Sequence, residues 1–149
     1  MERKIWFDMD GTIADLYGVD DWVHKIDNGI SSPYAQARPL VNMSVFAREL
    51  HKKQKSGIKI GIISWLSRSG TDSFNDEVKK TKLNWLKSHL PSVEWDEINI
   101  VPYGTPKHKV GAGVLFDDNK RVRAEWEKCN TDNIAFTQIN LISVLKGIV

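Results

Sequence analysis

The chain has 149 residues, of which 41% are hydrophobic and 27% are charged, a composition typical of one globular domain with a single core. The formal net charge of +2 is too slight to imply nucleic acid or a membrane as a partner, so nucleic acid is possible but not favoured and no membrane is expected. Cys129 is the only cysteine, which excludes an intrachain disulfide, a zinc knuckle and a paired redox motif.

The N-terminal segment MERKIWFDMDG reaches an acidic residue after a short apolar run, so it lacks the hydrophobic centre of a signal peptide. No stretch of the sequence is long and apolar enough to span a bilayer. A protein with one cysteine also suits a reducing compartment. We therefore expect a cytoplasmic protein.

Short apolar runs alternate with longer amphipathic segments along the chain, which predicts an α/β fold with a mostly parallel five-stranded sheet. In chain order, the predicted elements are a strand over 4–8, an irregular stretch over 13–39, a helix over 44–55, a strand over 58–64, a helix over 75–90, strands over 97–101 and 114–117, a helix over 120–129, a strand over 133–136 and a helix over 138–146. Several of the strands are apolar throughout, as strands buried on both faces are. We interpret 1–149 as a single domain and 13–39 as a short insertion over its functional site.

The most informative motif is FDMDGT, which ends the first predicted strand and begins a glycine-containing turn. It places two carboxylates, Asp8 and Asp10, just past the carboxyl end of that strand. In an open α/β sheet, ligands bind beyond the carboxyl ends of the strands, where residues from several strands converge. The motif therefore predicts an active site.

A second acidic pair, Asp117 and Asp118, follows the apolar run Val114-Leu115-Phe116 in the same way. Mg²⁺ prefers oxygen ligands and is typically held by one or two carboxylates together with a substrate phosphate. The two pairs together indicate a magnesium site. Capping of the following helix by the second pair is the alternative, and the two roles are compatible.

Two further strand-end features suit a phosphoryl group, whose transfer requires donors that neutralise the charge on its oxygens. Ser64 offers a hydroxyl at the end of the second strand, and Lys107 offers an ammonium group in the segment TPKHKVG. Lys109 is a rival to Lys107 because the register of that segment is uncertain. Trp65 could stack on a base or sugar, although packing is the simpler role for one of six tryptophans.

The motifs FDMDGT, IIS ending at Ser64, Lys107 and LFDD occur in the order found in the haloacid dehalogenase (HAD) superfamily, which the chain resembles over nearly its whole length. The resemblance implies a three-layer Rossmann-like fold and a Mg²⁺-dependent phosphohydrolase. It implies that Asp8 is the nucleophile that forms an aspartyl-phosphate and that Asp10 is the general acid/base. It also implies metal ligation by Asp8, the Asp10 backbone carbonyl and Asp117, with Asp118 as a direct or water-mediated helper, and phosphate binding by Ser64 and Lys107. Thr12 and Trp65 complete the expected substrate-binding set.

Within the superfamily, the chain looks most like the 5′(3′)-deoxyribonucleotidases, and a small nucleotide is therefore the expected substrate. Those enzymes carry a larger cap than 13–39, so a 3′-phosphatase acting on nucleic-acid ends is an alternative. A basic path into the site formed by Lys52, Lys53, Lys79, Lys80 and Lys82 would favour that alternative, whereas lysines on solvated helix backs would not. We expect solvated lysines. A phospho-receiver domain and a silent binding module are the non-enzymatic alternatives.

Overall fold

A five-stranded parallel sheet forms the centre of the computed structural model, which describes residues 3–149. Its strands are β1 (Lys4–Phe7), β4 (Lys59–Trp65), β5 (Glu97–Val101), β6 (Val114–Phe116) and β7 (Ile134–Phe136). Their order across the sheet is β5-β4-β1-β6-β7, so the chain starts at the centre, fills one side and then the other. This is the doubly wound order of a Rossmann-like fold, and it confirms the predicted α/β class.

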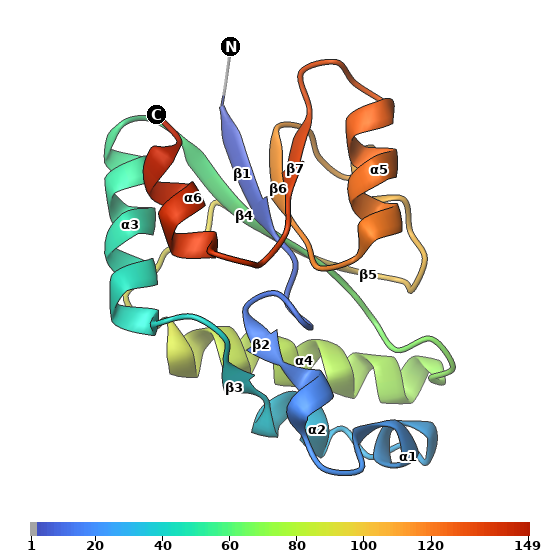
Figure 1. The fold of residues 1–149 in the computed structure, drawn as a ribbon. Helices are drawn as coiled ribbons and strands as arrows, with labels where there is room; N and C mark the ends of the chain where they lie inside the picture. The colour runs from blue at the N-terminus through green and yellow to red at the C-terminus, as the bar shows by residue number, and fades with distance from the viewer. Residues whose placement is uncertain (1–2) are drawn as a thin grey trace.

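Helices cover both faces of the sheet and also its carboxyl end (Figure 1). Helices α3 (Met43–Lys55) and α6 (Leu141–Gly147) lie together on one face, and α5 (Lys120–Lys128) lies on the other. Helix α4 (Asp72–His89) crosses beyond the carboxyl ends of the strands. The sheet and its two flanking helical layers make the predicted three-layer arrangement.

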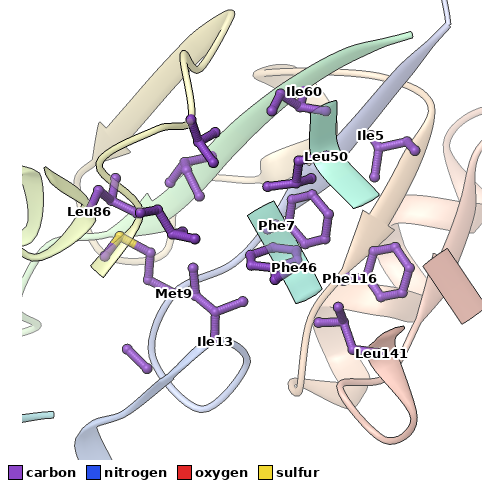
Figure 2. Packing of buried hydrophobic residues seen from close by; sticks show 14 of the residues in the cluster. Ile5, Phe7, Met9, Ile13, Phe46, Leu50, Ile60, Leu86, Phe116 and Leu141 are labelled. Atoms are coloured by element: carbon purple, nitrogen blue, oxygen red, sulfur yellow. The ribbon is translucent and has the colours of Figure 1, made fainter. Parts of the chain in front are cut away.

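Side chains of β1 are buried on both faces of the sheet, because alternate residues of a strand point in opposite directions. Phe7 faces α3 and packs edge-on against Phe46 with ring centroids 5.0 Å apart, and it stacks on Phe116 at 5.2 Å (Figure 2). Trp6 points to the other face and belongs to a separate cluster with Trp126 of α5. The wholly apolar run of β1 is therefore explained by its central place in the sheet.

In the segment over 13–39, the strands β2 (Ala14–Asp15) and β3 (Arg38–Pro39) form a two-stranded sheet. The short helices α1 (Trp22–Asp27) and α2 (Ser32–Gln36) lie between them in the chain. Helix α2 lies against α4 on the side away from the sheet, and α1 packs beside α2 (Figure 1). A third apolar cluster joins this segment to α4, and it contains Leu16, Ile26, Tyr34, Phe74 and Val78. The insertion is therefore packed against the body of the protein through α4.

Some predicted boundaries were wrong, each for a local reason. Helix α4 begins at Asp72 rather than at residue 75, because Thr71 caps it by accepting a hydrogen bond from the Phe74 N–H at 3.1 Å. Helix α6 begins at Leu141 rather than at residue 138, because Asn140 has a left-handed φ of 58° that interrupts a helix. Strand β4 continues past Ser64 to Trp65, which pairs with Val101 of β5.

The packing of α3 on the sheet can be tested with Leu50, which is fully buried in the main cluster. Replacing Leu50 with Ala leaves a cavity and is expected to lower the free energy of unfolding by about 2–5 kcal/mol, measured by urea denaturation. The matched control is Arg48→Ala on the exposed side of the same helix, with an expected change within about 0.5 kcal/mol. Equal effects of the two substitutions would contradict this packing.

Candidate functional site

The two acidic motifs meet where the strand order reverses, between β1 and β6. Phe7 of β1 pairs with Phe116 of β6, and the Asp8 N–H donates to the Phe116 carbonyl at 3.0 Å. The residues that follow the two strands, Asp8 and Asp117, are thereby held next to each other. The crevice at such a switch point is the ordinary ligand site of a doubly wound sheet.

Gly11 allows the chain to turn sharply over this crevice. Its φ of +80° lies in the left-handed region, and a Cβ atom built there would lie 2.4 Å from Asp118 Oδ2 and 2.6 Å from Tyr17 Cε2. No other residue type fits without moving the Asp118 carboxylate. The glycine of FDMDGT is therefore a requirement of close packing as well as of backbone conformation.

Lys107 lies between Asp8 and Asp117, the first aspartates of the two acidic pairs. Its Nζ donates to Asp8 Oδ1 at 2.9 Å and to Asp117 Oδ2 at 2.7 Å, and only 3% of the Lys107 side chain is exposed. Burial lowers the pKa of Lys107, but the two carboxylates together raise it above its usual value. Lys109, the rival candidate, is exposed, so the structure brings Lys107 and not Lys109 to the site.

Thr12 lies between the carboxylates of Asp8 and Asp118. Its Oγ1 is 3.0 Å from Asp8 Oδ2 and 3.1 Å from Asp118 Oδ1, and it accepts from the Asp118 N–H at 3.1 Å. A hydroxyl has one proton and can donate to only one of the two carboxylates at a time. Thr12 is fully buried and is not among the residues that border the cavity described below. Its contacts in this structure are with carboxylates, and its expected role in substrate binding stays a prediction.

Negative charge is in excess around these residues. Burial, with a further contribution from the Asp8 carboxylate, raises the pKa of Asp117 to about 6. Burial and the contacts with Asp8 likewise raise the pKa of Asp118 to about 7. Ligand oxygens of Asp8, Asp117 and Asp118 lie within 4.8 Å of one another. These three carboxylates repel one another, and a hard divalent cation such as Mg²⁺, which prefers oxygen ligands, would relieve that repulsion.

A second buried lysine, Lys82 of α4, holds the other carboxylate of FDMDGT. Its Nζ donates to Asp10 Oδ2 at 2.7 Å, to Ser64 Oγ at 2.8 Å and to the Trp65 carbonyl at 2.7 Å, with 1% of its side chain exposed. Burial raises the pKa of Asp10, although the Lys82 ammonium opposes the shift. Our expectation that Lys82 is solvated was wrong.

A signal for Lys82 was present in the sequence of α4. Lys82 lies four residues after Val78 and three before Trp85, so it shares their buried helix face. A lysine at an apolar position of an amphipathic helix indicates a buried partner. Lys53 is likewise buried, with its Nζ donating to the Ile148 carbonyl, whereas Lys52, Lys79 and Lys80 are exposed as expected.

The carboxylates open into a cavity of about 350 Å³. One wall comes from the insertion and is largely apolar, and the other contains Trp65 and Tyr103, whose ring centroids are 4.9 Å apart. The insertion supplies Leu16, Tyr17, Trp22, Val23, Ile26, Asp27 and Tyr34. Asp8, Asp10, Lys107, Asp117 and Asp118 all border the cavity. The site therefore joins a charged end to an aromatic pocket.

Two predicted substrate contacts have different positions. Trp65 borders the cavity, and its Nε1 donates to the Thr105 carbonyl at 2.9 Å, so its indole ring is fixed in place. Ser64 is fully buried, does not border the cavity, and accepts from Lys82 through its hydroxyl oxygen. In this structure the Ser64 hydroxyl contacts Lys82, and phosphate binding by Ser64 stays a prediction.

Comparison with known families decides the identity of this arrangement. The family model described as 5′ nucleotidase, deoxy (pyrimidine), cytosolic type C protein matches residues 40–141, well over half of the chain. The chain belongs to this family. It is thus a nucleotidase of the HAD superfamily, a phosphomonoester hydrolase, as the motifs predicted. No curated protein sequence matches the chain at a significant level.

The matched region contains Lys82, Lys107 and the acidic pair at Asp117 and Asp118, whereas FDMDGT lies before it. Asp8 and Asp10 are therefore assigned to the same site by their contacts with Lys107 and Lys82, and not by the family match. Membership of a hydrolase family also sets aside the two non-enzymatic alternatives. Within residues 3–149, no helix is long and apolar enough to cross a membrane.

The charge crowding at Asp118 predicts a pH-dependent effect of Asp118→Asn on the metal-free protein. Because the pKa of Asp118 is raised to about 7, the folded state binds its proton more tightly than the unfolded chain, and stability falls as pH rises from about 4 to about 7. The neutral Asn side chain avoids this loss and can still accept from Thr12. We expect Asp118→Asn to have a higher Tm than the wild type at pH 8 in a chelator, with the difference shrinking toward pH 4.5.

Each kcal/mol corresponds to about 2–4 °C in Tm for a domain of this size, so calorimetry can resolve the effect. Asp20→Asn, at an exposed position of the insertion, is the control and is expected to show no pH-dependent gain. A Tm of Asp118→Asn at or below that of the wild type at pH 8 would contradict a destabilising effect of the buried Asp118 charge.

Proposed function

We propose that this nucleotidase hydrolyses a nucleoside monophosphate through an aspartyl-phosphate on Asp8, with Mg²⁺ as its cofactor. The observation that carries the proposal is the convergence of Asp8, Asp10, Lys107 and the Asp117–Asp118 pair at the charged end of one aromatic cavity. A nucleophile, an acid/base, a phosphate-binding cation and a metal-ligand set are the parts that phosphoryl transfer needs.

Asp8 is oriented for attack on phosphorus by Lys107 on one oxygen and Thr12 on the other. A bond forms between a carboxylate oxygen of Asp8 and phosphorus while the bond from phosphorus to the nucleoside oxygen breaks. Water then attacks phosphorus and releases inorganic phosphate, which restores the Asp8 carboxylate. Lys107 lies beside Asp8 and faces the cavity, so it is placed to hold the phosphate oxygens during both steps.

Asp10 supplies the proton for the leaving nucleoside oxygen and then accepts a proton from the attacking water. Lys82 binds one of its oxygens, Oδ2, while Asp10 itself borders the cavity. A pKa raised by burial favours the protonated form that a general acid requires. The Lys82 ammonium limits that rise, so the group can also serve as a base in the second step.

Asp8, Asp117 and Asp118, together with the Asp10 backbone carbonyl, are the groups that would hold Mg²⁺. When bound, the ion would supply positive charge that neutralises the phosphate oxygens and the crowded carboxylates.

The shape and lining of the cavity favour a mononucleotide over a nucleic-acid end. A volume of about 350 Å³ suits a small ligand, and aromatic rings on both walls offer stacking faces for a base. Lys52, Lys53, Lys79, Lys80 and Lys82 do not border the cavity, so they form no basic path into it. By the criterion set from the sequence, the 3′-phosphatase alternative loses support.

The proposed activity predicts Mg²⁺-dependent phosphate release from deoxyribonucleoside and ribonucleoside monophosphates. Release from 3′-phosphorylated oligonucleotides and from sugar phosphates is expected to be weaker. Asp8→Asn removes the nucleophile and is expected to lower kcat by at least about 10³-fold. Acid quench with radiolabelled nucleotide is expected to trap a phosphoprotein in the wild type and none in Asp8→Asn. Asp20→Asn, whose side chain is exposed away from the cavity, serves as the activity control.

If phosphate release survives Asp8→Asn, the covalent mechanism is wrong. If release survives extensive chelation, the proposed cofactor is wrong. If only the oligonucleotide is hydrolysed, the substrate class reverts to nucleic-acid ends.

The role of Lys82 predicts that Lys82→Met lowers both activity and stability. Loss of the ammonium leaves the buried Asp10 carboxylate and Ser64 hydroxyl without their partner. We expect a fall of about 2 kcal/mol or more in the free energy of unfolding and a fall in kcat of at least about 10²-fold. Lys79→Met, on the exposed side of α4, is the matched control and is expected to change neither quantity appreciably. Activity of Lys82→Met near that of the wild type would contradict the assigned role.

A further inference from the structure

Tyr34 of the insertion lies directly against the lysine that holds Asp10. The Lys82 Nζ is over the Tyr34 ring at 5.1 Å from its centroid, and Tyr34 is 6% exposed. A desolvated ammonium over an aromatic ring is attracted by the ring's negative face. The ring therefore adds an aromatic contact to an ammonium group that also donates to three oxygens.

The position of Tyr34 is fixed from two directions. Its ring belongs to the apolar cluster that contains Phe74 and Val78 of α4. Just after α2, the Ala37 carbonyl accepts a buried hydrogen bond from Trp85 Nε1 at 2.8 Å. Helix α2 is therefore attached to α4 on both sides of Lys82 along the helix, at Val78 and at Trp85.

Burial raises the pKa of the Tyr34 phenol, and the nearby Asp10 carboxylate adds to the shift. The phenol thus stays protonated, and Ser67, which lies on the hydroxyl side of the ring, opposes the shift. The ring face and the hydroxyl consequently have different neighbours. Substitution can remove one of these contacts without removing the other.

We propose that Tyr34 is a positioning residue for catalysis, and that its ring face holds the Lys82 ammonium in the geometry that orients Asp10. The insertion then serves the chemical step through α2, in addition to contributing to the lining of the cavity. This inference rests on the proposed role of Asp10 as the acid/base. It assigns to the Tyr34 ring an effect on kcat rather than on substrate affinity.

The test compares Tyr34→Leu with Tyr34→Phe in the full-length protein. Tyr34→Leu removes the ring face, and we expect kcat to fall by about tenfold with KM changed less than threefold. Tyr34→Phe keeps the ring and removes the hydroxyl, and we expect it to restore kcat to within about threefold of the wild type. A larger effect of Tyr34→Phe than this would assign the role to the hydroxyl and overturn the proposal.

A control variant separates positioning from packing. Val78→Ala weakens the same apolar cluster one turn before Lys82, and Val78 is not among the residues that border the cavity. We expect Val78→Ala to lower Tm at least as much as Tyr34→Leu while kcat of the folded enzyme stays near that of the wild type. If the two variants lose kcat equally, Tyr34 has only a structural role.

A second readout does not depend on activity. A ring over an ammonium shifts the proton NMR signals of the Lys82 ε-methylene and ammonium groups upfield. We expect that upfield shift in the wild type and in Tyr34→Phe, and its loss in Tyr34→Leu. Absence of the shift in the wild type would overturn the proposal even if every variant were active. Absence of phosphatase activity in the wild type, with the NMR shift present, would instead count against the proposed function.

Discussion

Four carboxylates share a small region at the carboxyl end of the sheet, and two buried lysines make that arrangement possible. Lys107 bridges Asp8 and Asp117, and Lys82 binds Asp10. Even so, the pKa of Asp117 and that of Asp118 stay raised, because burial and mutual repulsion exceed the compensation. This residual negative charge makes the carboxylate cluster a suitable set of oxygen donors for a divalent cation.

The same balance explains why the two lysines come from different parts of the fold. Lys107 lies in the segment that leads into β6, so it reaches the pair of carboxylates beside the switch point. Lys82 comes from α4, the helix that crosses beyond the ends of the strands (Figure 1). Lys107 therefore compensates two carboxylates and Lys82 compensates one, each from a separate part of the fold, and both lysines are buried.

The insertion over 13–39 is small, yet it defines much of the pocket. Its apolar side chains form one wall, and its cluster with α4 attaches that wall to the helix that carries Lys82. In this member of the nucleotidase family, the pocket wall and Asp10 are thereby linked through one helix. Such a link leaves little room for the wall to move independently of α4, because the shared cluster is buried.

Local patterns in the sequence were enough to predict the α/β class, all five strands of the parallel sheet and the two acidic pairs, Asp8 with Asp10 and Asp117 with Asp118. These features depend on short hydrophobic runs and on the residues that directly follow them. The choice of Lys107 over Lys109, the burial of Lys82 and the true contacts of Thr12 and Ser64 were decided only by the tertiary structure. Those features depend on which helix face packs against a strand and on which oxygen lies nearest a buried ammonium. The contacts that decide them join residues far apart in the chain, and no local sequence pattern specifies such contacts.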